Sequence, residues 1–518
     1  MDKSKITITS ARGYFSNGKW FASFLMFSLL LGMLQKSAAA DTEDNFGFLF
    51  DHFQLTLEAG FRTEAAGPLY YSEQTEKTST LAFPPFFSRY RDPSVESQED
   101  DFLYPLLTSL HYGQEWRWQL FQLISFAGGQ EPDGATEKRF TLFPLYFQQR
   151  STDPDQNYTA FAPFYGHLKN RLHHDKIFFV LFPFYAQTQK KDVVTDNYLY
   201  PIGHVRNGNG LHGWAVWPLV GSEHKVPTLS TNGFGDVSVV AGHDYFFLLW
   251  PLYIQQDNGI GTDVPESVRV KTLTSKGGFG KRSFEVPDKF RASIPLFVYS
   301  RSPQFDSTTV LWPFFTYIDQ REKQYREWQM PWPIITFARG EGKTTSRVFP
   351  LFQTSHNATL ESDFYLWPLY TYHRTHSDPL DLCRTRVVFY LYSDMVEKST
   401  KTGAFKRRLD MWPFFTWHRD FTGNERLQVF APIEPVVPDN RGIERNWSPL
   451  WSLWRAENNP KDGATSHSLL WNLYRDEEAP AHKKVSLLFG LFQYQCDGET
   501  KRTKLFYLTV SKSSTTAK

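Results

Sequence analysis

A short motif centred on proline recurs along most of this sequence and constrains the fold more than any other feature. Its pattern is an apolar residue, an aromatic residue, proline, and then leucine or phenylalanine. From Pro144 to Pro218, and again from Pro295 to Pro368, the prolines recur at a nearly constant step of about 18 residues. Such a period indicates one structural unit that is reused about 22 times, rather than several unrelated domains.

Near the C-terminus the central proline is replaced by asparagine or glycine. Proline, asparagine and glycine share little except unusual backbone behaviour, so the centre of each repeat is expected to need a special conformation. The structural repeat residues selected on this basis are Pro144, Pro163, Pro183, Pro218, Pro251, Pro295, Trp312, Pro313, Pro350, Trp367, Pro368, Trp412, Pro413, Asn472 and Gly490.

Each repeat has the composition of a β-strand followed by a turn. In the copy at 307–319, β-branched and aromatic residues surround Pro313, and polar segments lie on either side. A helix does not fit, because a proline in the middle of nearly every segment would break it. We predict strands of about 9–12 residues with a bend or bulge at the proline, which puts Val310 and Trp312 on one face and Phe315 on the other.

The connections between these strands are too short for a parallel crossover, so successive strands should be antiparallel neighbours. The predicted fold is all-β, an antiparallel up-and-down meander of about 22 strands. Because so long a sheet would otherwise expose its edges, we expect it to close into a large β-barrel. A sheet that buries both faces, as a sandwich or a curled sheet, is the alternative.

The N-terminus has the features of a secretory signal, with basic residues up to Lys19, an apolar run at 21–34, and small residues ending at Ala40. An uncleaved membrane anchor is the alternative, although a spanning helix needs about 20 residues. The predicted organisation is a signal peptide at 1–40, a lead-in segment at 41–66, a single β-repeat domain at 67–510 with an irregular long loop at 255–287, and a C-terminal tail at 511–518.

Composition excludes several classes of protein. Aromatic residues make up 17% of the chain while mean hydropathy is −0.44, and disordered chains are poor in such rings. The chain has 56 Lys and Arg against 55 Asp and Glu, so no basic surplus points to a nucleic-acid partner. Cys383 and Cys496 could form one disulfide or none, and two cysteines in so long a chain cannot be a disulfide scaffold.

An exported chain with an up-and-down strand pattern, a polar average composition and many aromatics resembles bacterial outer-membrane β-barrel proteins, over roughly 60–510 and only at the level of that class. The resemblance implies a place in the cell outer membrane, contact with its lipid, export and barrel-assembly machinery as partners, and a role as channel, transporter or structural surface protein.

Three features depart from that class: aromatics at the centres of the predicted strands, an apolar core of about six or seven residues where spanning needs roughly 9–11, and a polar C-terminal tail. The alternative is a soluble periplasmic or secreted β-repeat scaffold that binds carbohydrate or a cell-envelope polymer, with the ligand unidentified.

No motif supports catalysis. The segment 208–213 matches GxGxxG but has no helical pattern after it, so a hairpin turn is predicted. The segment 277–283 resembles a phosphate loop only loosely and is interpreted as an ordinary loop. His173–Asp175, His373 and His376 are candidate metal ligands, but they lie in polar segments where solvated histidines are usual. We therefore predict no catalytic residues, no metal site and no cofactor.

Overall fold

The computed structural model of the chain describes residues 46–130, 134, 136–231, 237–260, 288–302, 304–321 and 324–514. The predicted signal peptide, most of the long loop at 255–287 and the segment 277–283 lie outside these residues. The following description therefore concerns the repeat domain and the end of the lead-in segment.

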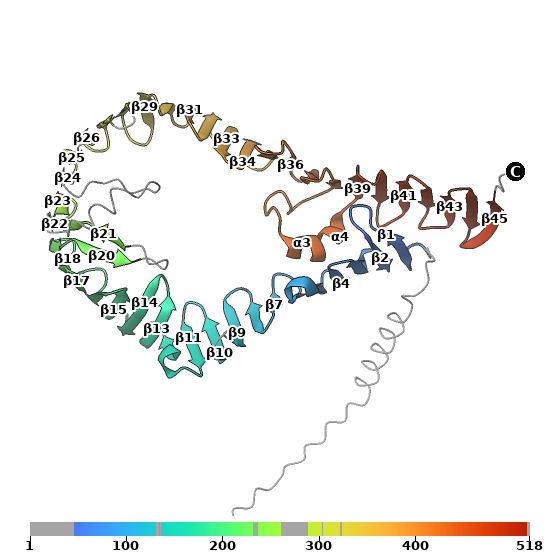
Figure 1. Cartoon of the computed structure of the whole chain (residues 1–518), viewed down its shortest axis with the longest axis horizontal. Helices are drawn as coiled ribbons and strands as arrows, with labels where there is room; N and C mark the ends of the chain where they lie inside the picture. Colours follow the sequence, from blue (N-terminus) through green and yellow to red (C-terminus); the bar gives the residue numbers. More distant parts are fainter. Residues whose placement is uncertain are drawn as a thin grey trace, which may run out of the picture. The chain divides into compact units, whose positions relative to one another are not determined.

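The described chain is nearly all β-structure. One antiparallel sheet contains 43 strands, and β20 and β21 form a separate hairpin. Each strand of the large sheet pairs with the strand that follows it, with β19 pairing directly with β22 across the inserted hairpin (Figure 1). This confirms the predicted all-β class and the antiparallel meander.

The strands are four to eight residues long. In chain order the first half comprises β1 (Asp51–Gln54), β2 (Gly60–Ala65), β3 (Tyr70–Thr75), β4 (Ser79–Phe83), β5 (Phe87–Asp92), β6 (Ser97–Phe102), β7 (Leu107–Tyr112), β8 (Glu115–Leu120), β9 (Ile124–Gln130), β10 (Thr136–Leu142), β11 (Tyr146–Ser151), β12 (Tyr158–Phe161), β13 (Tyr165–Arg171), β14 (His174–Val180), β15 (Tyr185–Lys190), β16 (Val193–Tyr198), β17 (Gly203–Gly208), β18 (Leu211–Val216), β19 (Val220–Lys225), β20 (Thr228–Thr231), β21 (Val237–Val240), β22 (Gly242–Leu248) and β23 (Tyr253–Ile260).

The second half comprises β24 (Asp288–Ser293), β25 (Phe297–Arg301), β26 (Phe305–Val310), β27 (Phe315–Gln320), β28 (Tyr325–Gln329), β29 (Ile335–Gly340), β30 (Lys343–Val348), β31 (Phe352–Asn357), β32 (Leu360–Tyr365), β33 (Tyr370–Ser377), β34 (Leu380–Val387), β35 (Tyr392–Ser399), β36 (Phe405–Met411), β37 (Phe415–Arg419), β38 (Glu425–Val429), β39 (Trp454–Asn459), β40 (Ala464–Leu469), β41 (Tyr474–Ala479), β42 (His482–Leu487), β43 (Phe492–Asp497), β44 (Thr500–Leu505) and β45 (Leu508–Ser514).

Each repeat forms a hairpin of two short strands, so the prediction of one long strand per repeat, and hence of about 22 strands, is wrong. In the copy at 307–319, β26 ends at Val310 and β27 begins at Phe315, and these two residues are paired directly opposite each other. They therefore lie on the same face, not on opposite faces as predicted. The reason is that an apolar run around a proline suits a turn as well as a strand, and proline has no N–H to contribute to a ladder.

The two kinds of connection lie on opposite edges of the sheet. Connections from an even-numbered strand to the next odd-numbered strand carry the proline motif or its variants, and we call this side the aromatic edge. The other connections are polar, and we call that side the polar edge. Asn209 and Gly210 connect β17 to β18 there, which confirms the hairpin turn predicted for the segment 208–213.

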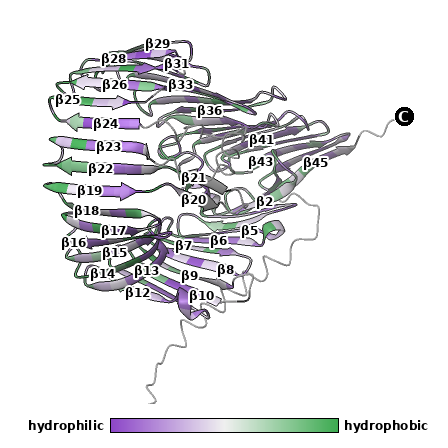
Figure 2. Cartoon of the chain, turned by 60° about the vertical axis from the view of Figure 1, so that its left-hand side comes forward, coloured by the Kyte–Doolittle hydropathy of each residue, from purple (hydrophilic) through white to green (hydrophobic). Residues whose placement is uncertain are grey.

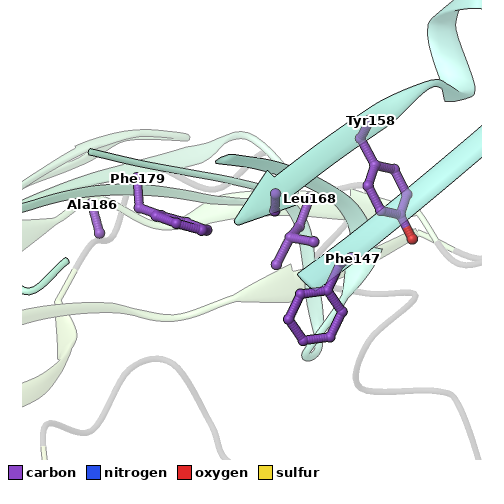
Figure 3. Packing of buried hydrophobic residues seen from close by; sticks show 6 residues of the cluster. Phe147, Tyr158, Leu168, Phe179 and Ala186 are labelled. Atoms are coloured by element: carbon purple, nitrogen blue, oxygen red, sulfur yellow. The ribbon is translucent and has the colours of Figure 1, made fainter. Parts of the chain in front are cut away.

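Side chains on one face of the sheet pack into small clusters, and we call this the packed face. One cluster on β11–β15 contains Phe147, Tyr158, Ala160, Leu168, Phe179 and Ala186 (Figure 3), and a second contains Ala215, Phe247, Ile254 and Ala292. Small residues alternate with aromatic residues in these clusters because the rings fill the space above the neighbouring strands. A Cβ added at Gly166 would lie 2.3 Å from the Cβ of Ala160, closer than two carbons can approach.

The predicted closure into a barrel is wrong for this structure. Among the described strands, β1 pairs with β2, β45 pairs with β44, and no ladder joins the two ends of the sheet. Side chains of the first two strands instead meet those around β40 and β41, for example where Asn472, in the turn between these strands, donates a hydrogen bond to Glu64 of β2 at 2.8 Å. Backbones separated by packed side chains are too far apart to form a ladder, because packed sheets lie about 10 Å apart.

Two short helices interrupt the meander between β38 and β39. They are α3 (Arg441–Asn446) and α4 (Ser448–Trp451), and Asn440 caps α3 by accepting a hydrogen bond from the Ile443 N–H at 3.0 Å. The insertion begins near Pro432, whose segment at 430–434 has the pattern of the repeat motif. Single 3₁₀ turns occur at Gly67–Leu69, Pro93–Val95 and Pro154–Gln156. No helix in the described part of the chain has the length and apolar character to cross a membrane.

Candidate functional site

The proline motif forms the tight turns of the aromatic edge. Each selected proline follows a cis peptide bond and sits in a turn of three or four residues. The structure places all the selected repeat residues in these turns: Pro144, Pro163, Pro183, Pro218, Pro251, Pro295, Trp312, Pro313, Pro350, Trp367, Pro368, Trp412, Pro413, Asn472 and Gly490.

Asn472 and Gly490 occupy turns with positive φ angles, 69° and 83° respectively. The preceding residues in those turns, Trp471 and Phe489, are also left-handed. The expectation of a special backbone at the centre of the repeat is therefore confirmed, although the backbone forms a turn rather than a bulge within a strand.

Consecutive turns are hydrogen-bonded to one another. The N–H before one proline donates to the carbonyl of the preceding proline between Phe182 and Pro163 at 2.6 Å, between Tyr200 and Pro183 at 2.7 Å, and between Trp367 and Pro350 at 2.7 Å. Other neighbouring turns are joined by the residue at the start of the turn, as Leu311 N–H donates to Leu296 O at 2.8 Å. The aromatic edge is therefore a continuous ridge rather than a row of independent loops.

This ridge exposes large apolar side chains to solvent. Trp312 is 45% exposed and Phe314 is 54% exposed, and the paired strand residues beside that turn, Val310 and Phe315, are 45% and 53% exposed. Hydrophobic residues gather at one end of β19, β22 and β23 in Figure 2. Monomeric proteins rarely expose a long continuous apolar surface unless it meets something apolar.

The depth of the apolar surface varies along the aromatic edge. Tyr253 and Tyr365 are the strand residues next to their turns, and both are exposed. Two residues further from the edge on the same face, Gln255 and Asp363 are polar. At about 3.4 Å per strand residue, the apolar layer is about 5–10 Å deep at these two turns. It is deeper on β9 and β18, where Phe126 and Trp214 are exposed at the third strand position from the turn.

A second region buries charge where the first and last strands meet, and we call it the charged interface. Asn472 lies between two carboxylates and donates to Asp51 at 3.2 Å as well as to Glu64. Arg475 pairs with Glu477 and stacks over the Phe53 ring, with its Cζ 3.3 Å from the ring centroid. The two hydrogen bonds of Asn472 thus connect the first two strands to the turn between β40 and β41.

The charged interface shifts the protonation of its carboxylates in opposite directions. Burial raises the pKa of Asp51 to about 7, although Arg475 and Lys484 act in the opposite direction. Burial also disfavours ionised Glu64, but Arg62 and other nearby arginines outweigh it and lower its pKa. The result is one carboxyl that holds a proton near neutral pH beside one that does not.

The insertion between β38 and β39 adds further ion pairs to the N-terminal strands. Arg445 of α3 reaches Asp101 on β6 at 2.8 Å and Glu99 at 2.6 Å, and the Asp101 carboxylate also accepts from Ser88 at 3.1 Å. The Trp447 ring N–H donates to the Tyr104 carbonyl oxygen at 2.8 Å. These contacts tie the insertion to the turns of the aromatic edge near β6.

The candidate metal ligands are dispersed. His174 contacts the carbonyl oxygen of Leu172 at 2.8 Å in a turn of the polar edge, and the His376 ring lies 3.8 Å from Asp381. In the described part of the chain, no three His, Cys, Asp or Glu side chains are grouped closely enough to hold a metal ion. Cys383 and Cys496 lie on β34 and β43 and are both free thiols.

Sequence reasoning found the residues of the aromatic edge but not their exposure, and it missed the charged interface entirely. Asp51, Arg475 and Glu477 carry no local motif, and their importance comes from contacts between opposite ends of the repeat domain. No sequence signal in a single chain could have paired them. No protein-family model matches this sequence, and no curated protein shows significant similarity to it.

Proposed function

We propose that this chain is an exported protein of the bacterial cell envelope that binds a lipid bilayer through its aromatic edge and has no catalytic role. The observation that carries the proposal is the ridge of hydrogen-bonded turns whose tryptophan, phenylalanine and leucine side chains are exposed. We place it at the outer membrane, as the resemblance to outer-membrane proteins implied. Its contribution there is attachment to, or shaping of, the lipid surface.

The side chains of the ridge suit a membrane–water interface. Tryptophan directly precedes the turn proline at Trp217, Trp250, Trp312, Trp332, Trp367 and Trp412. An indole ring has an apolar body and one N–H donor, which makes tryptophan enriched where lipid meets water. A surface designed for a protein partner would not need the same ring at the same position in so many turns.

The depth of the apolar layer supports insertion into one leaflet rather than a span. A transmembrane barrel needs an outward apolar band about 25 Å tall. A six-residue strand is only about 20 Å long. Beside the turns next to Tyr253 and Tyr365 the polar residues begin at the third strand position, whereas on β9 and β18 the exposed Phe126 and Trp214 occupy it. Elements that lie in the interface insert about 5–10 Å, which is the depth of the apolar layer at the turns next to Tyr253 and Tyr365.

The proposal sets aside the channel and transporter roles that the resemblance implied, because the described strands do not close into a barrel, and it keeps a role at the membrane surface. It also competes with the soluble alternative, in which the exposed rings bind a carbohydrate or envelope polymer. Sugars stack on aromatic rings too, so exposure alone does not choose between lipid and polymer. Regular repetition along one edge, at a depth that suits one leaflet, favours lipid.

Flotation with neutral phosphatidylcholine vesicles tests the proposal. The wild-type chain should float with the vesicles, and its tryptophan fluorescence should be quenched more by a spin label near the head of the acyl chain than by one near its end. The variant Trp250→Glu/Trp312→Glu/Phe414→Glu should bind at least about a hundredfold more weakly, because each buried ring contributes about 1.5–3 kcal/mol.

Tyr112→Glu is the matched control, because Tyr112 is exposed at the far end of β7, beside the polar edge. This variant should float like the wild type. A wild-type chain that stays in the aqueous fraction while binding an envelope polysaccharide would contradict the proposal and favour the soluble scaffold.

A further inference from the structure

A hollow of about 600 Å³ lies against β30–β34 next to the aromatic edge. Its apolar side is formed by Phe349 and Trp367, which belong to turns of the edge, and by Phe364. The rings of Phe349 and Trp367 lie 5.6 Å apart. The hollow therefore opens beside the surface that the proposed function places in lipid.

The other side of the hollow is strongly basic. It contains Arg347 on β30 and Arg384 and Arg386 on β34, together with His373. Arg384 and Arg386 are two positions apart on one strand, so both side chains are on the same face. Arg347 and Arg386 each occupy the second strand position from their turn, which brings them to the same depth below the edge.

These arginines are not neutralised by acidic partners in the part of the chain that the structure describes. The Nε of Arg386 is buried without a hydrogen-bond partner there, and Arg347 donates to the neutral Gln353 at 2.6 Å. Burial lowers the pKa of Arg384, and the positive charge of Arg386 lowers it further. Buried arginines that lack acidic partners are stabilised in their charged form when an anionic ligand binds beside them.

The carboxylate that lines the hollow is already engaged. Asp363 accepts a hydrogen bond from the Ser355 N–H at 3.2 Å and makes a contact with the His356 ring at 3.1 Å. Asp394, on the strand after Arg386, pairs with Arg407 at 2.8 Å. The nearby acidic groups therefore leave the basic side of the hollow without a counterion.

We propose that this hollow binds the phosphate of an anionic phospholipid, whose acyl chains lie along the neighbouring rings of the aromatic edge. The inference rests on the proposed function, because the lipid is taken from the bilayer that the edge enters. Guanidinium groups match phosphate with paired hydrogen bonds, and phenylalanine and tryptophan supply the apolar surface for the chains.

The arginines lie at the level where a headgroup would be. They start two residues from the turn, about 5–7 Å behind the apolar ridge. A phosphate lies at that level when the ridge is inserted among the first carbons of the acyl chains. A free phosphate would use the arginines alone, whereas a phospholipid would also use Phe349, Phe364 and Trp367.

Calorimetry with soluble short-chain lipids tests the inference on the full chain. The ligands are dihexanoyl phosphatidylglycerol, dihexanoyl phosphatidylcholine and glycerol 3-phosphate, each below the concentration at which it aggregates. Phosphatidylglycerol should bind about tenfold or more tightly than either of the others. The variant Arg384→Gln/Arg386→Gln should weaken its binding by about tenfold or more, because charge-assisted hydrogen bonds are lost.

Lys138→Gln/Lys176→Gln is the matched control, because it removes the same net charge at two exposed positions away from the hollow. It should leave the affinity unchanged. Equal binding of phosphatidylglycerol and phosphatidylcholine would overturn the inference, and glycerol 3-phosphate binding as tightly as the lipid would reduce the hollow to a site for free phosphate and also overturn it.

The two proposals fail in different ways. Arg384→Gln/Arg386→Gln should still float with phosphatidylcholine vesicles, since the aromatic edge is intact. If the wild type floats but shows no preference for phosphatidylglycerol, the inference about the hollow is contradicted, while the proposal that the aromatic edge binds membranes is supported. A wild type that does not float but binds the soluble anionic lipid would contradict the proposal that the aromatic edge binds a bilayer. It would also contradict the inference about the hollow, because the lipid would then not come from a bilayer.

Discussion

Folded proteins usually bury apolar side chains and expose charged ones. The aromatic edge departs from this by exposing rings, and the charged interface departs from it by burying charges. At the aromatic edge, rings such as Trp312 and Phe314 are exposed. At the charged interface, Asp51 is 1% exposed and Arg475 is buried beside it. One sheet therefore exposes apolar groups in one region and buries ionisable groups in another, and the two regions meet at the turn that contains Asn472.

The difference shows which surroundings the side chains of each region require. The exposed rings contact some neighbouring rings of the edge, as Phe349 contacts Trp367, but much of their surface still faces solvent, which is explained by an apolar environment outside the protein. Buried charges need partners within the chain, and Arg475 has Glu477 and the Phe53 ring while Asn472 bridges Asp51 and Glu64. The first region serves binding, and the second holds the first and last strands together.

The largest effect should come from breaking the charged interface. Arg475→Ala should lower the free energy of unfolding by about 3–5 kcal/mol, because it leaves Glu477 as a buried charge without its partner. Chemical denaturation measures this change. Arg321→Ala is the control, since Arg321 pairs with Asp306 at the surface and its loss should change stability far less than Arg475→Ala does. Similar losses of stability in the two variants would mean that the charged interface stabilises the fold no more than an ion pair at the surface does.

The next effect concerns the proton on Asp51, whose pKa is about 7 in the folded chain against 3.8 for an ordinary aspartate. Between these values the folded state keeps a proton that the unfolded state releases. The contribution of Asp51 to the free energy of unfolding therefore falls as pH rises from about 4 to about 7, by at most about 1.4 kcal/mol per pH unit.

Asp51→Asn should remove that contribution, because asparagine stays neutral. Denaturation of both proteins from pH 4 to pH 8 should show the variant gaining stability relative to the wild type as pH rises, with a plateau above about pH 7. Glu64 and Glu477 have lowered pKa values and act with the opposite sign, but they are present in both proteins. A difference that does not vary with pH would show that Asp51 is ionised throughout.

The smallest effect should be at the aromatic edge, where a ring contributes to binding rather than to folding. Phe314→Ala should change the free energy of unfolding by no more than about 0.5 kcal/mol, since the side chain is mostly exposed. Phe179→Ala, in the packed cluster of Figure 3, should cost about 3–5 kcal/mol. If Phe314→Ala proved equally costly, the edge would be part of the core and the comparison would fail.

The period of the repeat was sufficient to predict the all-β class and the antiparallel order of the strands, because short polar connections permit nothing else. It was not sufficient to place the strands within the repeat. The segment around Pro313 contains Val310, Trp312 and Phe315, and their β-branched and aromatic side chains favour a strand whether or not the chain reverses there. Only the pairing of Val310 with Phe315 shows the turn.

The basic hollow could have been suspected in part, since Arg384 and Arg386 alternate on one strand in a chain of nearly balanced charge. That these arginines lack acidic partners could not be predicted from the sequence, because it depends on which side chains the neighbouring strands bring to the same face. The charged interface was beyond prediction for the same reason, as Asp51 and Arg475 meet only through the fold.

The sequence by itself determined the unit of this protein: its regular period, its β-structure, and the rings and prolines that mark each copy. These follow from local preferences and from spacing, which are properties of a single segment. The tertiary structure alone decided that the rings are exposed along one edge and that the ends meet through buried charges rather than a ladder. Exposure and pairing depend on what lies opposite a residue, and that is set by strands from other repeats.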